Sequence, residues 1–488
     1  MSKKKFMNIG GLYGGLNLYE PQTAIADNEC TESIDCMPGA SSMVEPRLAF
    51  SNSGSVASYS TLLQIYEQQN PGSVTNPTVW VLRDDGAIYR DSALIQSGAG
   101  VVDSYKAFFG EYLNAFYFRK GPTELYKWDG TTSSLVNTFS NEITDVAFYE
   151  NRIFVSTAGS NQERIYYSPV GTDTSFTDYI FIPAQGERAY TMTPTSNGIY
   201  IGTGKGTYLL AGRSALSFSI RKVLDNISPM AGFSLNWREN LVFIDWNSRK
   251  LYIWDGYGVP IVLDEHMRSG EYLENYWLKP AINTLENCHF SLNGDLLTVQ
   301  HYNSSTSERG MWVFDLGKTR NAKPPVSYWD IAAKRISGGS FISMETGTPI
   351  YARTFRPKTG GKIDSYDIDG ANYNKILPSV TTKYFHMENN LFAERIYRTS
   401  FCTVGSGTLS VDINSFGSTS DTRNYEVSLN DLYSVPSITT ANQASASTSG
   451  PIIAVKVAYD DIDDYATAQT TKASEVINVT IEFDTENP

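Results

Sequence analysis

The sequence predicts an all-β fold, in which a β-propeller of six or seven blades follows an extended arm and precedes a β-sandwich-like domain. Two features of the 488 residues indicate this fold. Aromatic residues make up 13% of the chain, and aromatic and β-branched side chains suit the pleated, half-buried surface of a sheet. In addition, an aliphatic or small residue followed by an aromatic one recurs at the spacing of propeller blades, about 40–50 residues.

The recurring pair has seven copies, whose aromatic positions are separated by 37, 40, 42, 44, 60 and 39 residues. Seven copies allow six or seven blades, depending on whether the first copy pairs with the last to close the ring. The copies are Ile88-Tyr89, Leu125-Tyr126, Ile165-Tyr166, Thr207-Tyr208, Leu251-Tyr252, Met311-Trp312 and Ile350-Tyr351.

Two copies extend into nearly identical hexapeptides that end in an Asp-Gly turn. The shared residues are Tyr126, Trp128, Asp129, Gly130, Tyr252, Trp254, Asp255 and Gly256. Because both hexapeptides occupy the same place in the repeat, we expect the tryptophans to pack between blades and the aspartates to cap turns. The alternative is that the tryptophans are platforms on which a sugar stacks. Further hairpin turns are expected at Asn197-Gly198, Glu239-Asn240 and Asn293-Gly294.

We expect three parts along the chain: an extended arm over residues 1–55, the propeller over 56–376, and the sandwich-like domain over 377–488. The gap of 60 residues between motif copies marks an inserted segment near 263–287, which is partly helical until Pro280 interrupts it. The junction near Pro378 is a plausible linker.

The arm and the C-terminal domain carry local signals of their own. The Gly-rich arm has too few periodic apolar residues for a core, so it packs on its own domain or on a neighbour, with a possible short helix around Thr23–Asp35. After residue 376 the alternation of polar and apolar residues predicts strands at 393–398, 409–413, 452–457 and 476–483, with a Ser/Thr-rich loop over 437–450.

The composition limits the classes of function. A net charge of −13 disfavours stable nucleic-acid binding, because the only dense basic cluster is Lys3-Lys4-Lys5, while an acidic wall would still let DNA pass without adhering. The sequence contains no run of 18 consecutive apolar residues, so we expect no membrane span, and no secretory signal is visible. The cysteines (Cys30, Cys36, Cys288 and Cys402) indicate reduced thiols.

We expect no enzyme, cofactor or metal. The four histidines have no metal-ligand spacing. Glycoside hydrolysis needs two carboxylates facing one sugar, and the candidates are Asp84, Asp85, Asp129, Asp245, Asp255 and Asp315. Calcium is a minor alternative at Asp364 to Gly370, which lacks the closing Glu of a calcium loop, and at Asp460 to Asp464, which is more simply a solvated turn.

The start of the chain resembles the N-terminus of many bacteriophage tail and neck proteins. The resemblance rests on Gly14-Gly15-Leu16-Asn17, Pro21, Ala24 to Asn28, Met37-Pro38-Gly39 and Glu45-Pro46-Arg47. This chain has Pro46-Arg47-Leu48 where those proteins have an Arg-Pro-Gly-like end. With the Tyr-x-Trp-Asp-Gly repeats and a β domain opening near Thr382-Lys383, the layout is similar to the nozzle, or packaged-DNA stabilisation (tail hub), proteins of short-tailed phages.

The resemblance implies a structural virion protein, assembled in the host cytoplasm. Six copies would form a ring below the portal and its adaptor, extend the DNA channel, retain the packaged genome and offer docking sites for fibres or spikes. The residues that line the channel are unknown, and no catalytic residues carry over. One alternative is a receptor- or glycan-binding propeller of the tail tip, which exposed aromatics in one pocket would favour. The other is a polysaccharide-degrading propeller.

Overall fold

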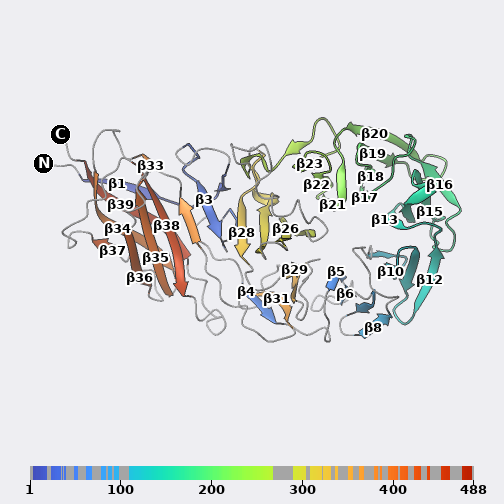
Figure 1. The fold of residues 1–488 in the computed structure, drawn as a ribbon, viewed down its shortest axis with the longest axis horizontal. Helices are drawn as coiled ribbons and strands as arrows, with labels where there is room; N and C mark the ends of the chain where they lie inside the picture. Colours follow the sequence, from blue (N-terminus) through green and yellow to red (C-terminus); the bar gives the residue numbers. More distant parts are fainter. Residues whose placement is uncertain are drawn as a thin grey trace.

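The computed structural model describes most of the predicted propeller and the strands on either side of it (Figure 1). The described residues are 4–18, 24–34, 36, 38–39, 49–52, 62–68, 78–83, 86–90, 93–97, 109–267, 289–303, 308–320, 322–330, 336–338, 350–354, 362–367, 379–382, 385–386, 394–404, 407–415, 423–429, 437–439, 452–461 and 475–485. Every helix among them is a short 3-10 turn, so the described chain is an all-β protein.

Seven sheets of the described chain form the blades, which follow one another round a ring in Figure 1. Blades 1 to 3 are β5–β8 (Leu62–Gln68, Thr78–Arg83, Ile88–Arg90, Ala93–Gln96), β9–β12 (Gly110–Tyr112, Ala115–Lys120, Glu124–Trp128, Ser133–Thr138) and β13–β16 (Ile143–Tyr149, Arg152–Thr157, Arg164–Tyr167, Asp178–Phe181). Blades 4 and 5 are β17–β20 (Thr191–Thr195, Gly198–Gly202, Gly206–Ala211, Ser219–Asp225) and β21–β24 (Pro229–Trp237, Asn240–Asp245, Leu251–Trp254, Ile261–Val262).

The last two blades differ from the rest because the N-terminal arm joins them. Blade 6 is β25–β28 (His289–Asn293, Leu296–Asn303, Glu308–Asp315, Val326–Asp330), and blade 7 is β29–β31 (Ile336–Gly338, Ile350–Thr354, Lys362–Asp367) with β4 (Ala49–Asn52) from the arm. β4 pairs parallel with β31. An N-terminal strand therefore completes the last blade, and the part of the chain that the structure describes contains seven blades.

The alternating direction of side chains along the second strand of a blade explains how neighbouring blades stack, as β14 and β22 show. Successive side chains of a strand point to opposite faces of its sheet. In β14, Ile153 and Val155 pack against blade 2, whereas Phe154 packs against blade 4. In β22, Leu241 and Phe243 likewise face blade 4, whereas Val242 and Ile244 face blade 6. Both faces of these strands are buried, which is why the middle of each strand is an unbroken apolar run, Ile153 to Val155 and Leu241 to Ile244.

The arm is a set of strands inserted between the other parts of its own chain. β1 (Lys4–Ile9) pairs with β39 (Glu475–Thr485), and β2 (Gly15–Leu16) pairs with β3 (Glu29–Ile34). β3 lies between β28 of blade 6 and β32 (Ser379–Thr382). The helix expected around residues 23–35 is therefore wrong. Thr31 and Ile34 are β-branched, and two strand edges stand ready to pair with this segment, so tertiary pairing prevails over local propensity.

The C-terminal strands form two sheets of a sandwich-like domain. One contains β1, β39, β34 (Glu394–Val404) and β37 (Ser437–Thr439). The other contains β32, β33 (Phe385–His386), β38 (Ile452–Asp461), β35 (Gly407–Ser415) and β36 (Arg423–Leu429), and β3 makes it continuous with blade 6. The loop expected over 437–450 begins as a strand, and its remaining residues after Thr439 lie outside the described chain, as does Pro378.

Two further expectations concern the inserted segment and membrane-spanning helices. Of the insertion near 263–287, the structure describes only Leu263 to Met267, which ends in the 3-10 turn Glu265–Met267, and residues 268–287 lie outside it. Within the described residues, no helix has the length and apolar character needed to cross a membrane.

Candidate functional surfaces of the propeller

The two related hexapeptides occupy equivalent places in blades 2 and 5. Tyr126 lies opposite Phe118 and stacks on it, with ring centroids 6.0 Å apart and an interplanar angle of 13°. Tyr252 lies opposite Phe243 in the same way, at 5.5 Å and 19°. The sequence similarity therefore reflects a shared packing arrangement between the second and third strands of a blade.

The tryptophans of the hexapeptides pack towards the preceding blade. Trp254 is 4% exposed and lies 5.2 Å from Tyr200 of blade 4, measured between ring centroids. Trp128 is partly buried and meets Trp80 of blade 1 edge to face at 6.5 Å. The indole faces are used inside the protein, which leaves little of them for a sugar ring.

The Asp-Gly pairs form the turns between third and fourth strands. The Asp129 carboxylate accepts hydrogen bonds from the backbone N–H groups of Thr131 and Thr132, both at 2.8 Å, and these bonds lower the pKa of Asp129. The Asp255 carboxylate accepts one from the Tyr257 N–H at 2.9 Å. Gly130 and Gly256 have φ of +101° and +92°, which side-chain-bearing residues rarely adopt.

The other candidate carboxylates of the described chain also hold backbone. Asp245 is 1% exposed and accepts hydrogen bonds from the N–H groups of Ser228 (2.7 Å) and Ser248 (2.6 Å). Asp315 accepts one from the Lys318 N–H (3.2 Å) at the start of a 3-10 turn, Leu316–Lys318. Asp84 and Asp85 lie outside the described residues.

The two acidic segments considered for calcium are strands where they are described. Asp364 to Asp367 belong to β31, and Asp460 and Asp461 end β38, while residues 368–370 and 462–464 lie outside the described chain. An extended strand points successive side chains to opposite faces, so it does not wrap its carboxylates round one ion. Within the described residues, no group of three or more His, Cys, Asp or Glu side chains is placed to hold a metal.

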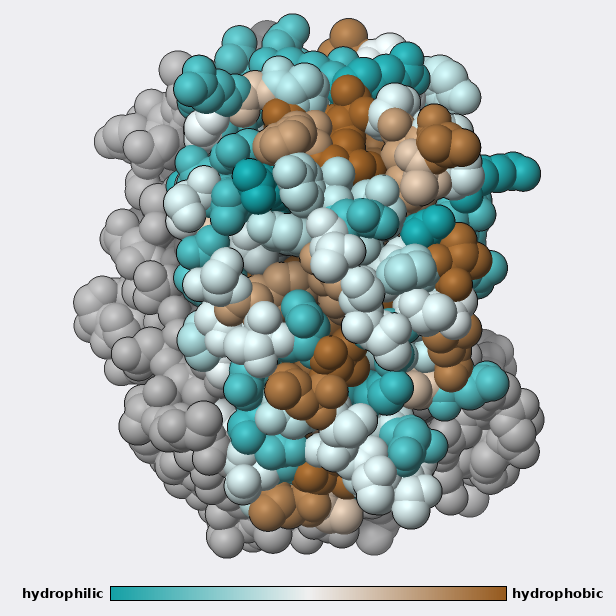
Figure 2. All heavy atoms as spheres, turned by 90° about the vertical axis from the view of Figure 1, so that its right-hand side faces the viewer, coloured by the Kyte–Doolittle hydropathy of each residue, from teal (hydrophilic) through white to brown (hydrophobic). Residues whose placement is uncertain are grey.

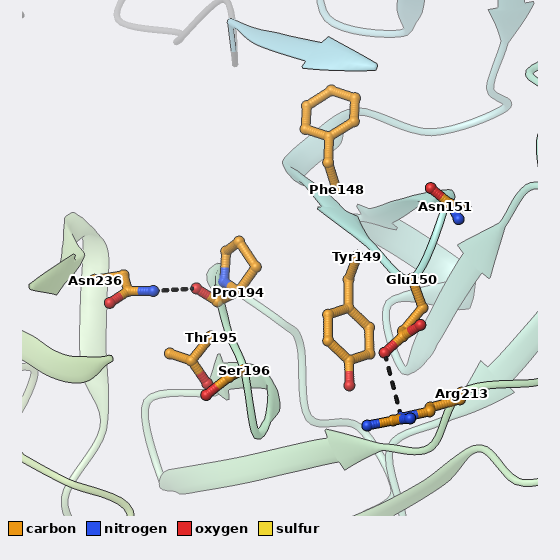
Figure 3. A pocket seen from close by; sticks show the side chains of 9 residues that line it. All are labelled: Phe148, Tyr149, Glu150, Asn151, Pro194, Thr195, Ser196, Arg213 and Asn236. Atoms are coloured by element: carbon orange, nitrogen blue, oxygen red, sulfur yellow. Dashed lines mark hydrogen bonds and ion pairs between the residues drawn. The ribbon is translucent and has the colours of Figure 1, made fainter. Parts of the chain in front are cut away.

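A hollow of about 550 Å³ opens between blades 3 and 4, at the turns that join first and second strands (Figure 3). In blade 3 this turn is formed by Glu150 and Asn151, whose φ values of +46° and +51° suit a two-residue hairpin. No local sequence pattern indicates this site, because its residues come from separate blades. It is lined by Phe148, Tyr149, Glu150, Asn151, Pro194, Thr195, Ser196, Arg213 and Asn236.

The polar groups of the hollow are tied to one another. Arg213 forms an ion pair with Glu150 at 3.8 Å, and the Asn236 amide donates to the Pro194 carbonyl at 3.0 Å (Figure 3). Burial, with a smaller contribution from Glu150, raises the pKa of Tyr149. Glu150 is the one carboxylate among the residues that line the hollow, whereas glycoside hydrolysis uses two.

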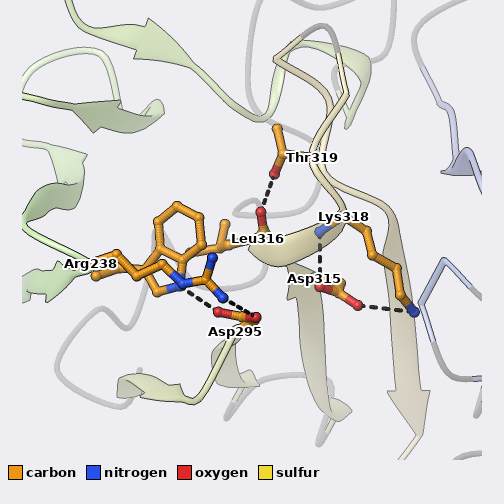
Figure 4. A network of polar contacts seen from close by, with 7 residues as sticks. Arg238, Asp295, Asp315, Leu316, Lys318 and Thr319 are labelled. Carbon is orange, nitrogen blue, oxygen red and sulfur yellow. Dashed lines mark hydrogen bonds and ion pairs between the residues drawn. The ribbon is translucent and has the colours of Figure 1, made fainter.

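A polar network joins blades 5 and 6 and reaches the arm (Figure 4). The Asp295 carboxylate accepts hydrogen bonds from the Trp237 indole N–H (3.0 Å) and the Arg238 guanidinium (2.7 Å), which both belong to blade 5. In the same blade as Asp295, Lys318 pairs with Asp315 at 3.2 Å and donates to the Pro38 carbonyl at 3.3 Å. Pro38 belongs to the arm, so this network helps to hold the arm on the propeller.

A second cluster beside the arm contains a buried histidine. The His266 side chain is 2% exposed, and neither ring nitrogen has a hydrogen-bond partner within the described chain. Its backbone carbonyl accepts the N–H of Leu18 at 2.8 Å. Burial, reinforced by Lys323, lowers the pKa of His266 from 6.5 to about 4, although Glu29 and the Pro324 backbone act in the opposite direction. Glu29 is itself buried and pairs with Lys323 at 3.7 Å.

Exposed apolar side chains gather on one face of the propeller and on its outer edge. Because neighbouring strands of blades 1 to 5 run antiparallel, the connections after their first and third strands emerge on one face, where the hollow also lies. That face carries Leu113, Val170, Leu216, Tyr257 and Val259, each exposed by 47% or more. The described connections on the opposite face carry no exposed large apolar residue. The outer edge shows separate apolar groups among polar atoms (Figure 2).

The strand topology thus defines the class of this chain, which is a β-propeller protein. No model of a protein family and no curated protein matches its sequence. Among solved structures it is similar to BamB from Moraxella catarrhalis, with 10% identity and a TM-score of 0.33 over 68% of this chain and 96% of that chain. It is also similar to the structure described as YCF48 bound to D1 peptide, with 8% identity and a TM-score of 0.35 over 61% and 95%. Likenesses of this size concern the fold alone.

Proposed function

We propose that this chain is a structural virion protein that forms the tail nozzle ring of a short-tailed phage. Its copies, as a homohexamer, would extend the DNA channel below the portal and adaptor, retain the packaged genome and offer docking sites for fibres or spikes. The observation that carries the proposal is the phage-like Gly14-Gly15-Leu16-Asn17 segment. Leu16 and Asn17 are buried at the joint between propeller and sandwich, where the arm links the two.

The mechanical properties of the fold support this role. A channel wall under the pressure of packed DNA needs parts that do not slide past one another. The arm pairs with the sandwich through β1, with blade 6 through β3 and with blade 7 through β4. Backbone hydrogen bonds of the arm therefore join the sandwich to the two blades at which the ring closes. A net charge of −13 would repel DNA phosphates, so the genome could leave without adhering.

The asymmetric surface also supports an assembly role. Apolar loop tips such as Leu216, which is fully exposed, sit on one face only. These loop tips belong to blades 2 to 5, and a face that carries several of them suits contact with another protein. We infer that this face contacts neighbouring virion proteins. Since the described arm residues pack on their own chain, ring contacts would come from this face, from the outer edge or from the insertion.

A glycan-binding propeller is the second candidate, and the hollow between blades 3 and 4 favours it. Tyr149 could offer a ring edge, and Glu150, Arg213 and Asn236 supply polar groups round it (Figure 3). Against it, the Phe148 ring is held between Tyr112 and Tyr117 at 6.2 and 5.8 Å, so it is part of the packing between blades 2 and 3. An enzyme is the least supported reading, since the hollow holds one carboxylate.

Particles assembled without this chain test the proposed function. We expect heads that fill with DNA and then lose it, because nothing seals the channel below the adaptor. Supplying the purified chain to fresh heads should restore retained, nuclease-protected DNA. An Arg213→Ala variant is the matched control, because it alters the hollow alone and should restore retention fully. Particles that keep their DNA but fail to adsorb would support the glycan-binding candidate and overturn the nozzle proposal.

A further inference from the structure

The outer strand of blade 3, β16, has an unprotected edge. It pairs with β15 on one side, and its other side ends the sheet. Unpaired strand edges tend to recruit other chains, so proteins usually blunt them with bulges, very short strands or charges. The third and fourth strands of blades 1, 2 and 4 are interrupted by register shifts, and β24 of blade 5 has two residues. β16 pairs with β15 in four consecutive registers without a shift.

The side chains of this edge are aromatic and exposed. Tyr179 and Phe181 point to the same side of β16 and are 39% and 49% exposed. Their rings meet edge to face, with centroids 5.1 Å apart and an interplanar angle of 83°. Tyr166, on the neighbouring strand, lies 5.9 Å from Tyr179. The strand has no proline and no lysine, and its one charged residue is Asp178 at its first position.

A cation lies over these rings. The guanidinium carbon of Arg164 is 4.4 Å from the centroid of Tyr179 and 5.6 Å from that of Phe181. Within the described residues Arg164 has no carboxylate partner, and its Nε atom is buried without a hydrogen-bond acceptor. The stacking fixes the orientation of a fork of donors that suits a carboxylate. Tyr and Arg, partly desolvated, are also the residues that dominate binding energy at interfaces.

We propose that β16 is a strand-addition site for an extended segment of another protein, with glutamate or aspartate on the side that faces Arg164 and apolar residues on the other. Main-chain hydrogen bonds to the open edge would supply affinity, and the carboxylate on Arg164 would supply selectivity. The unpaired guanidinium is the reason for choosing an acidic segment over a basic one. This inference is independent of the proposed nozzle role, because it rests on blade 3 alone.

Two end-capped peptides of eight residues test the site on the full-length chain. In one, valine alternates with glutamate; in the other, valine alternates with lysine. We expect the glutamate peptide to bind with a Kd below about 1 mM and to protect the amides of residues 178–181 from hydrogen exchange. The lysine peptide should bind at least about tenfold more weakly, because it places ammonium groups beside Arg164.

Matched substitutions locate the effect. Phe181→Asp and Tyr179→Asp place a carboxylate beside Arg164 at exposed positions, so each should weaken the glutamate peptide by about tenfold or more while leaving Tm nearly unchanged. Leu135→Asp, at a 50% exposed position of β12, is the control and should leave binding intact. Arg164→Gln should remove the preference between the peptides. The proposal is overturned by absence of binding, by equal binding of both peptides, or by protection elsewhere than β16.

Discussion

His266 shows how one side chain couples the arm to the propeller. It is buried, and both of its ring nitrogens lack hydrogen bonds within the described chain. The neutral imidazole is tolerated there, whereas a charged one would lose its hydration, a cost that Glu29 and the Pro324 backbone offset only in part. Its neighbours in sequence, Glu265 and Met267, would have given no hint of this, because Glu29 and Lys323 reach it from distant parts of the chain.

Because of His266, the free energy of unfolding should therefore decrease as the pH is lowered. The pKa of His266 is about 4 in the folded chain and ordinarily 6.5, so the unfolded chain binds the proton more readily. The stability that the neutral form provides is complete above about pH 6.5 and is lost as the pH falls towards 4. Between pH 7.5 and 5.5 we expect a loss of about 1 kcal/mol from this residue, measured by urea unfolding.

A His266→Gln variant separates this effect from the titration of other groups. The variant should lose about 1 kcal/mol less than the natural chain over the same pH interval. Parallel pH profiles of the two proteins would contradict the account, because they would mean that His266 takes up its proton equally well in both states.

Trp254 provides a second test at the scale of one residue. It is 4% exposed and fills space between blades 4 and 5, so Trp254→Ala should lower the free energy of unfolding by about 3–5 kcal/mol. Tyr257, three residues later, is 75% exposed, and its backbone carbonyl accepts the Trp254 indole N–H at 2.9 Å. Tyr257→Ala should change stability by less than about 0.5 kcal/mol. Similar costs for both would show that Trp254 does not pack between blades.

At the scale of elements, local patterns predicted what local physics determines. The Asp-Gly turns require only a few neighbouring residues, and β34, β35, β38 and β39 follow from alternating apolar side chains. The hairpin expected at Glu239-Asn240 lies one residue earlier, at Arg238 and Glu239, which both have positive φ. The predicted helix failed because two partners of β3, the strands β28 and β32, lie about 300 residues or more further along the chain, where no window of sequence reaches them.

The same distance in sequence explains why candidate sites were missed. The hollow takes residues from the turns of two blades and from β21, and the edge of β16 becomes visible only when its pairing is compared with that of other outer strands. Asp245 and Asp315 are candidates for catalysis in the sequence because glycoside hydrolysis needs carboxylates. Their hydrogen bonds to backbone N–H groups could be known only from the fold.

The seating of the arm predicts how its cysteine reacts. Cys30 is 1% exposed, and burial raises the pKa of its thiol well above the usual range, with Glu29 and Glu32 adding to the effect. Alkylation of Cys30 by iodoacetamide should therefore require the arm to open. Leu16→Asp places a charge in the apolar cluster under the arm and should speed this reaction by about tenfold or more, followed by peptide mass spectrometry.

The matched control for this experiment is Leu216→Asp, which changes a fully exposed leucine in blade 4. It should leave the rate at Cys30 unchanged. If Cys30 in the natural chain reacts as fast as in the denatured chain, the arm is not seated as β2 and β3 describe.

At the scale of the whole molecule, the seven-bladed ring is closed by β4 and braced by the sandwich sheet that continues blade 6. The apolar loop tips lie on one face, and the aromatic edge of β16 lies at the outer rim. Such a body has two surfaces for contacts and a scaffold that holds them fixed. We infer that it is built to stand between other proteins, which is the central feature of the nozzle proposal.

The copy number of this chain in purified virions, measured against the portal protein by quantitative mass spectrometry, tests that proposal most directly. A six-fold ring on a twelve-fold portal predicts about half as many copies as the portal has. Absence of the chain from virions would contradict the nozzle proposal. A copy number well above that of the portal would also contradict it, because it would indicate a fibre or spike component.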